Sequence, residues 1–171
     1  MTIGSLIHWL NESGLSAYLR QSDLAFPLTE AIHLIGLGAS VGIVLWIDLR
    51  LSGLALRREP VSSVVATLEP WAVRGFAVMI VSGVFLFLSK PETYAAVTAF
   101  RIKLVLLVFA GLNVLFFHKV VLPNVAKWDE SHSIPWQARF VGMASILLWI
   151  MVAILGRWTA YFADPLYTLG R

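Results

Sequence analysis

Four long apolar stretches, separated by short polar segments, set the pattern of the chain. They cover residues 27–49, 71–88, 100–121 and 137–155. At a helical rise of ~1.5 Å per residue, each spans most or all of a hydrocarbon core of ~30 Å. The pattern therefore predicts an all-α, integral membrane four-helix bundle. The length of the chain suits one such bundle, so we expect residues 1–171 to form a single membrane domain.

A weaker helical pattern precedes the first of these spans. Four apolar residues recur there at helical spacing: Ile3, Leu6, Ile7 and Leu10. The run is too short to cross a bilayer, and it is typical of a helix that lies in the membrane interface. We therefore expect a short N-terminal interfacial helix before the bundle.

Prolines and glycine predict where several spans begin and end. Pro27 suits the first turn of the first span, because a proline there loses no hydrogen bond. We expect residues 61–69 to form a separate surface helix, and Pro70 with Trp71 to begin the second span. The fourth span is expected to end before Gly156.

The first span carries polar residues that membrane helices ordinarily avoid, because a charge in hydrocarbon is costly. At ~100° per residue, four of them fall within an arc of roughly 80°. These are Glu30, His33, Ser40 and Asp48. Gly38 and Gly42 mark a different face, at a spacing that lets two helices approach closely. The pattern predicts a polar face turned into the bundle and a glycine face against a neighbouring helix.

Composition supports the membrane class and excludes several kinds of chemistry. Of the 171 residues 58% are hydrophobic and 13% are charged, whereas soluble domains carry about 25% charged residues. The chain has no cysteine, which excludes disulfides, thiolate metal sites and cysteine catalysis. The net charge of +3 matches the basic loops of membrane proteins, so it does not point to a nucleic-acid partner.

Basic residues also predict the orientation of the chain. An even number of spans places both termini on one side of the membrane. Arg50, Arg57 and Arg58 follow the first span directly, and basic residues near the first span favour the cytoplasmic side. We therefore expect the termini on the opposite, periplasmic side.

The two histidines within the spans lie at different predicted depths. His33 falls early in the first span and His118 late in the third, and both spans enter from the same side. At ~1.5 Å per residue their depths differ by roughly 17 Å. The axial ligands of one haem must lie at similar depth, so this pair is not expected to hold a single haem.

Four polar residues are expected near the membrane side that carries the termini, and they form our candidate ligand site. They are Glu30, His33, Lys103 and Arg157. The simpler alternative is that these charges only neutralise one another, because intramembrane charges tend to pair. In that case Glu30 would pair with Lys103 or Arg157, and on the other side Asp48 would pair with Arg74.

The spacing of Glu30 and His33 invites comparison with metal proteins. At i, i+3 the carboxylate and the imidazole share one helical face, as in four-helix di-metal proteins. Those proteins need two such motifs, and this chain has no second one on a span. The metal site left to consider is a single copper or haem iron, with His33 as one ligand and His8 as the other. The alternative is that His33 is a hydrogen-bonded histidine of the helix packing.

Several short segments, in the same order along the chain, resemble a bacterial family catalogued as domain of unknown function 6644. The matching residues are Glu30–Gly36, Asp48–Gly53, Pro70–Trp71, Ser82–Gly83, Phe100–Lys103, Asn113 and Gly156–Tyr161. The resemblance covers nearly the whole chain and implies a four-helix protein of the bacterial inner (plasma) membrane, with no established activity. A weaker similarity, mainly around Lys103 and Asn113, is to copper-resistance D-type membrane proteins.

These observations lead to three functional hypotheses. The first is a non-enzymatic binding or accessory subunit of a membrane assembly, such as a redox assembly, with the lipid bilayer and other membrane subunits as partners. The second is an electron-transfer protein that binds haem b or a quinone at His33. The third is copper handling through His33 and His8. No nucleophile triad, phosphate loop or nucleotide motif points to an enzyme.

Overall fold

The computed structural model describes residues 2–131 and 134–163, and it is helical almost throughout. Four of its helical segments are long and apolar enough to cross a membrane. They are Ala25–Leu51, Val61–Ser89, Thr98–Asn124 and Trp136–Phe162. The predicted all-α class and the four membrane helices are therefore confirmed.

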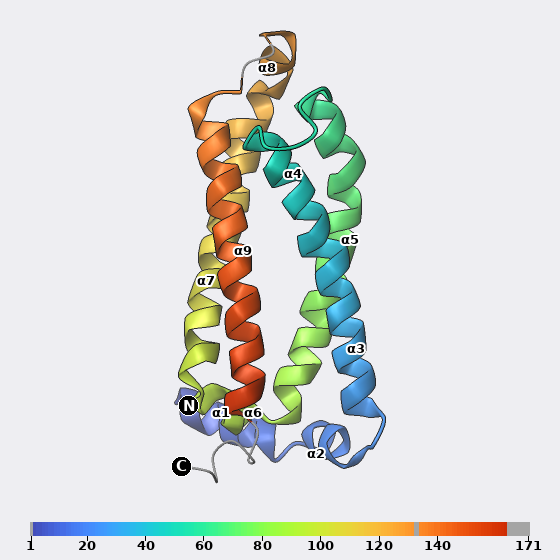
Figure 1. The fold of residues 1–171 in the computed structure, drawn as a ribbon. Helices are drawn as coiled ribbons and strands as arrows, with labels where there is room; N and C mark the ends of the chain where they lie inside the picture. The colour runs from blue at the N-terminus through green and yellow to red at the C-terminus, as the bar shows by residue number, and fades with distance from the viewer. Residues whose placement is uncertain (1, 132–133, 164–171) are drawn as a thin grey trace.

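The four spans form two helix pairs that meet most closely at one end (Figure 1). The first and third spans are interrupted by short π-helical segments, so each comprises several elements. The elements of the spans are α3 (Ala25–Leu37), η1 (Gly38–Gly42), α4 (Ile43–Leu51), α5 (Val61–Ser89), α7 (Thr98–Phe116), η2 (Phe117–Val121), η3 (Leu122–Asn124) and α9 (Trp136–Phe162). Helix α3 packs on α5, α7 packs on α9, and α4 joins the pairs by contacting both α5 and α9.

Short helices cover the two ends of the bundle. Helices α1 (Ile3–Asn11), α2 (Gly14–Gln21) and α6 (Pro91–Ala96) lie at one end, which we call the α6 end. Helix α8 (Val125–Ser131) lies at the opposite end, the α8 end. Helix α1 runs across the bundle axis and exposes Ile3 and Trp9, as an interfacial helix should.

Two predicted boundaries are wrong because the spans are longer than their most apolar parts. Helix α5 begins at Val61, and Pro70 lies inside it rather than at its start. Its first turns stay helical because Val61, Val64 and Val65 pack into the core, which compensates for the hydrogen bond that Pro70 cannot donate. Helix α9 continues through Gly156 to Phe162, so the predicted exit of the fourth span is also wrong.

The helices approach each other closely, but not at the two glycines that the sequence predicts. An added Cβ at Gly75 would lie 2.7 Å from the Ser40 backbone nitrogen and 2.8 Å from the Ala39 carbonyl carbon. No atom lies within 4 Å of the corresponding positions at Gly38 and Gly42. The expectation that these two glycines face a neighbour is therefore wrong. They belong to the π-helical segment η1, whose backbone does not follow the α-helical rotation used to define the faces.

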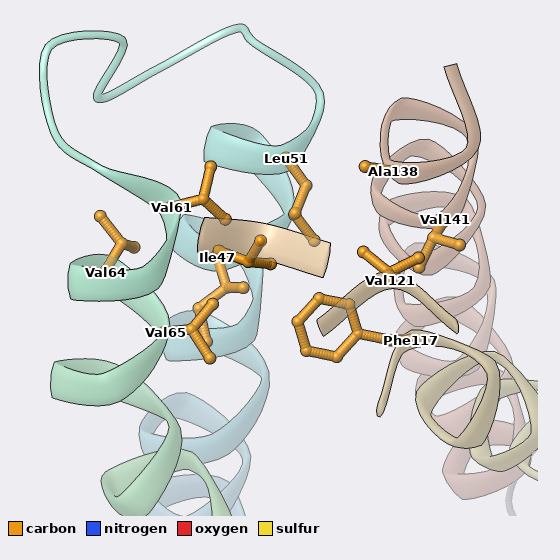
Figure 2. Close-up of a cluster of buried hydrophobic side chains, with 10 residues drawn as sticks. Ile47, Leu51, Val61, Val64, Val65, Phe117, Val121, Ala138 and Val141 are labelled. Carbon is orange, nitrogen blue, oxygen red and sulfur yellow. The ribbon is translucent and has the colours of Figure 1, made fainter. Parts of the chain in front are cut away.

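At the α8 end, all four spans contribute to one cluster of buried apolar side chains (Figure 2). Leu51, Val61 and Val121 are each 1% exposed, and Ala138 is fully buried. A second cluster lies between the helix pairs and contains Trp149, whose ring centroid is 5.2 Å from that of Phe76. Many apolar side chains point outward along the spans, as expected for a surface covered by lipid.

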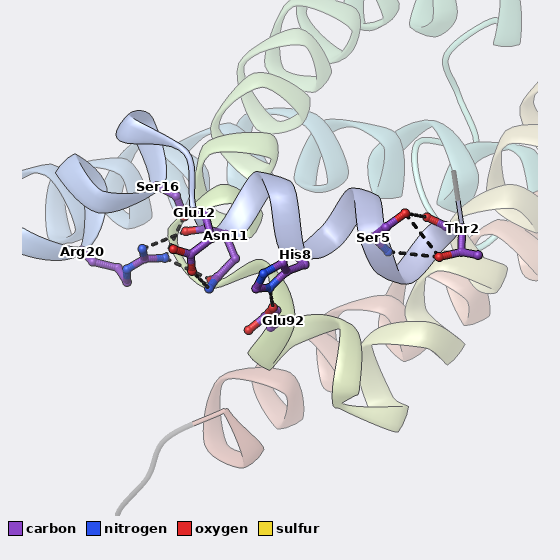
Figure 3. A network of polar contacts seen from close by, with 8 residues as sticks. All are labelled: Thr2, Ser5, His8, Asn11, Glu12, Ser16, Arg20 and Glu92. Atoms are coloured by element: carbon purple, nitrogen blue, oxygen red, sulfur yellow. Dashed lines mark hydrogen bonds and ion pairs between the residues drawn. The ribbon is translucent and has the colours of Figure 1, made fainter.

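Polar contacts join α1 to α2 (Figure 3) and fix both helices to the end of α5. The Arg20 guanidinium donates to the Asn11 side chain and backbone, to Ser16 Oγ at 2.8 Å and to the Ser89 carbonyl at 3.3 Å. Ser16 Oγ donates in turn to the Leu88 carbonyl at 2.6 Å. These bonds satisfy carbonyls in the last turn of α5 that have no partner within the helix.

Candidate functional site

His33 projects from α3 towards α5, where Ser82 holds its ring. The distance from His33 Nδ1 to Ser82 Oγ is 3.0 Å, and the imidazole is half-buried. Ser82 Oγ also lies 2.7 Å from the Val78 carbonyl, to which the hydroxyl can donate. In that arrangement His33 Nδ1 carries the proton and donates to Ser82 Oγ, and Nε2 keeps its lone pair.

Glycine leaves room for this ring on α5. A Cβ added at Gly83 would lie 3.1 Å from His33 Cε1, which is closer than ordinary packing distances. The Ser82–Gly83 pair thus supplies both the hydrogen-bond partner and the space for the imidazole. In the sequence, this pair stands out only through the family resemblance. The feature that could have indicated its role is a serine next to a glycine within an apolar span.

Lys103 and Glu30 both lie within electrostatic reach of His33. Lys103 extends from α7 across to α9, where its Nζ would be 3.3 Å from a Cβ added at Gly156. The lysine is half-buried, whereas Glu30 is exposed. Within residues 2–131 and 134–163, Glu30 forms no ion pair, so the expected pair with Lys103 or Arg157 is not found.

Arg157, the fourth predicted site residue, points to its own helix instead. Its Nη2 donates to the Tyr161 hydroxyl at 3.1 Å, and its guanidinium carbon lies 4.5 Å from the centroid of the Tyr161 ring. The side chain is therefore held one helical turn further along α9. The structure thus groups Glu30, His33 and Lys103, while the Arg157 guanidinium is engaged elsewhere.

His8, the second predicted metal ligand, is held by α6. Its Nδ1 lies 2.8 Å from Glu92 Oε1, and the side chain is 70% exposed (Figure 3). Among the residues that the structure describes, no group of three or more histidine or acidic side chains is arranged to hold a metal ion. A metal site that joins His8 to His33 gains no support from these contacts and stays a prediction.

The His8–Glu92 pair makes a testable link between α1 and α6. The hydrogen bond that His8 donates to the Glu92 carboxylate, together with the charge of that carboxylate, raises the pKa of His8. A raised pKa means that the pair contributes stability below about pH 6.5, and that this contribution is lost as pH rises through the folded-state pKa. We expect Glu92→Gln to lower the pKa of His8 towards its ordinary value, as measured by NMR titration of the imidazole protons. An unchanged pKa would contradict this assignment.

His118 and Glu69 form a second pair, near the α8 end. The His118 Nε2 to Glu69 Oε1 distance is 2.5 Å, and Nδ1 bonds the Val114 carbonyl at 2.9 Å. Glu69 lies on α5, thirteen residues (82 − 69) before the Ser82 that holds His33. At ~1.5 Å per residue, the two histidines are therefore about 20 Å apart along the bundle. This separation confirms that one haem cannot be bound between them.

Asp48 is a buried carboxyl group that forms no ion pair with any residue the structure describes. It is 4% exposed, Ser145 lies close enough to hydrogen-bond it, and its Oδ2 has no hydrogen-bond partner among the described residues. The predicted partner, Arg74, instead has its guanidinium carbon 4.8 Å from the centroid of the Trp71 ring. The expected Asp48–Arg74 pair is therefore wrong, because the arginine stacks on its own helix.

Comparison with known proteins identifies the family but no characterised relative. No curated protein and no solved structure matches the chain. The similarity to copper-resistance D-type membrane proteins is therefore not shown. The sequence profile of one family of unknown function does match, over residues 9–162. This range includes all four spans and every residue grouped around His33, and the chain accordingly belongs to the family of unknown function DUF6644.

Proposed function

We propose that this protein is a non-enzymatic binding subunit of an inner-membrane assembly, and that its ligand lies beside His33. The arginines that follow the first span favour the cytoplasm for the α8 end. On this orientation the termini and the α6 end face the periplasm, and the ligand lies in the periplasmic half of the membrane.

The observation that carries the proposal is the hydrogen bond from His33 to Ser82. It fixes the position of the ring, and with the proton on Nδ1 it leaves the lone pair on Nε2. The bond made by one ring nitrogen decides what the other can accept, so a ring held in this way is suited to bind a ligand.

A quinone is the ligand class that these side chains suit best. The Lys103 ammonium group is a donor for a quinone carbonyl, and His33 Nε2 is an acceptor for the hydroxyl of the reduced form. Both side chains come from apolar spans, where a membrane-soluble ligand can reach them. Haem b is the second candidate, because an axial histidine commonly donates its other ring nitrogen to a nearby oxygen, as His33 does to Ser82.

The experiment compares the purified protein with two histidine variants. Protein in mild detergent is extracted with organic solvent for quinone analysis, and an absorption spectrum is recorded for haem. We expect about one ligand per chain in the wild type and in His118→Ala, and loss of the ligand in His33→Ala. His118 is the matched control because it also bonds a side chain of α5.

Two results would overturn the proposal. A wild-type preparation that contains neither quinone nor haem would show that the protein binds neither ligand. Retention of the ligand by His33→Ala would show that the ligand does not depend on His33. The subunit role is tested separately by native gel electrophoresis of membranes solubilised in mild detergent. Migration of the protein as a lone monomer under those conditions would contradict it.

A further inference from the structure

A basic cavity lies at the α8 end, away from His33. Its volume is about 380 Å³. The loop between α4 and α5 lines it together with the start of α9 and part of α8. Four arginines contribute to the lining: Arg50, Arg57, Arg58 and Arg139. Four guanidinium groups around one small cavity indicate a site for an anion.

Two of these arginines are anchored by the backbone of the loop. Arg50 Nε donates to the Glu59 carbonyl at 2.7 Å, and Arg57 Nε donates to the Gly53 carbonyl at 2.6 Å. Arg50 is also 92% buried, since its exposure is 8%. In both cases the anchoring bond uses Nε and leaves the two Nη groups for a ligand. The site is therefore built in advance, which reduces the cost of ordering long side chains on binding.

The loop backbone itself is shaped to make these bonds. Gly53 has a φ of +72° and Leu56 has a φ of +50°. The second value is uncommon for a residue with a branched apolar side chain. These two left-handed residues turn the chain back on itself, so that Arg57 reaches the Gly53 carbonyl and Arg50 reaches the Glu59 carbonyl.

The acidic residues of the cavity do not neutralise it. Asp129 accepts hydrogen bonds from the backbone N–H groups of Val61 at 2.6 Å and Ser62 at 3.1 Å. It thereby caps the N-terminus of α5, and although burial works in the opposite direction, these bonds and the nearby Arg50 lower the pKa of Asp129. Glu59 is exposed. Among the described residues that line the cavity, four arginines and two acidic side chains leave an excess of two positive charges.

The position of the cavity along the bundle further limits the class of ligand that it can bind. It lies where α4 ends and where α5 and α9 begin, which is the boundary between the apolar spans and water. Lipid phosphate groups occupy this depth, and basic pockets between membrane helices bind anionic head groups. Arginine rather than lysine lines the cavity, and the guanidinium fork matches the oxygens of a phosphate group.

We propose that this cavity binds a phosphate group, presented by the head group of an anionic phospholipid or by a soluble phosphate compound. The proposal is independent of any ligand at His33. Each arginine near a membrane surface strengthens the binding of anionic lipid roughly fivefold, so removal of two should weaken it roughly 25-fold.

The test uses full-length protein in two arms. In the first, native mass spectrometry counts retained phosphatidylglycerol against phosphatidylcholine from mixed micelles. In the second, equilibrium dialysis measures the binding of inorganic phosphate without anionic lipid. The variants are Arg57→Gln with Arg58→Gln, and Arg58→Gln alone, which breaks none of the bonds described above. The control is Arg101→Gln at the α6 end, because Arg101 Nε likewise donates to a backbone carbonyl, that of Ala95 at 2.8 Å.

Each outcome either supports or overturns the proposed phosphate site. Preferential retention of phosphatidylglycerol that falls roughly 25-fold in the double variant and fivefold in Arg58→Gln, but not in Arg101→Gln, would support a lipid head group. Saturable phosphate binding with the same variant dependence, and no lipid preference, would support a soluble phosphate compound. The proposal is overturned if neither is bound, or if Arg101→Gln weakens binding as much as the single cavity variant.

Discussion

Replacing Gly75 with alanine is expected to lower the free energy of unfolding by about 1–3 kcal/mol. The new Cβ would lie 2.7 Å from the Ser40 backbone nitrogen and 2.8 Å from the Ala39 carbonyl carbon. Both are backbone atoms, so no side-chain rotation can relieve the overlap. Helix α5 would have to move away from η1, and the packing of the first helix pair would loosen.

The matched control for this substitution is Gly111→Ala in α7. Gly111 also lies within a membrane helix, but no atom lies within 4 Å of an added Cβ. Alanine there should stabilise the helix slightly, by roughly 0.5–1 kcal/mol, because it restricts the unfolded chain. Titration with a denaturing detergent, followed by tryptophan fluorescence, measures both changes. Equal stability of the two variants would contradict the close packing at Gly75.

Replacing Asp48 with asparagine is expected to raise the free energy of unfolding at pH 8 by about 1–3 kcal/mol. Asp48 is buried, and its Oδ2 has no hydrogen-bond partner in the described part of the chain. An ionised carboxylate in such a place is costly, because no ion pair with a described residue compensates for its lost hydration. Asparagine keeps the size of the side chain and a hydrogen bond with Ser145, but carries no charge.

Asp23→Asn serves as the control for this prediction. Asp23 is exposed between α2 and α3, so the loss of its charge should change the free energy of unfolding by less than about 0.5 kcal/mol. The same detergent titration compares both variants with the wild type. A destabilised Asp48→Asn protein would show that the ionised carboxylate is stabilised in the native state, and would overturn the reasoning from burial.

The architecture was predictable because membrane spans are defined by length and apolarity, which the sequence displays directly. The errors arose where packing overrides local signals. Pro70 has the sequence context of a helix start, but the valines before it pack at helical spacing into the core and keep α5 continuous. Gly156 has the context of a helix end, but no polar turn follows it, and α9 continues.

The candidate site was predicted only in part, for two physical reasons. His33 and Lys103 stood out because polar groups are rare in spans, and the structure places them within electrostatic reach. Ser82 did not stand out, because a serine can satisfy its hydroxyl within its own helix and is common in membrane helices. In addition, η1 changes the rotation of the first span, so Glu30 is exposed although Asp48 is buried.

The pairing of the spans has a consequence for how the chain enters the membrane. All of the contacts that α5 makes with α3 and η1, including that of Gly75 with Ala39, lie within the first 89 residues. The first pair can therefore insert and close as a helical hairpin while the ribosome is still synthesising α7 and α9. The second hairpin then docks onto a finished surface, through α4 and the residues around Trp149. Biogenesis on this view is the association of two hairpins rather than the simultaneous packing of four helices.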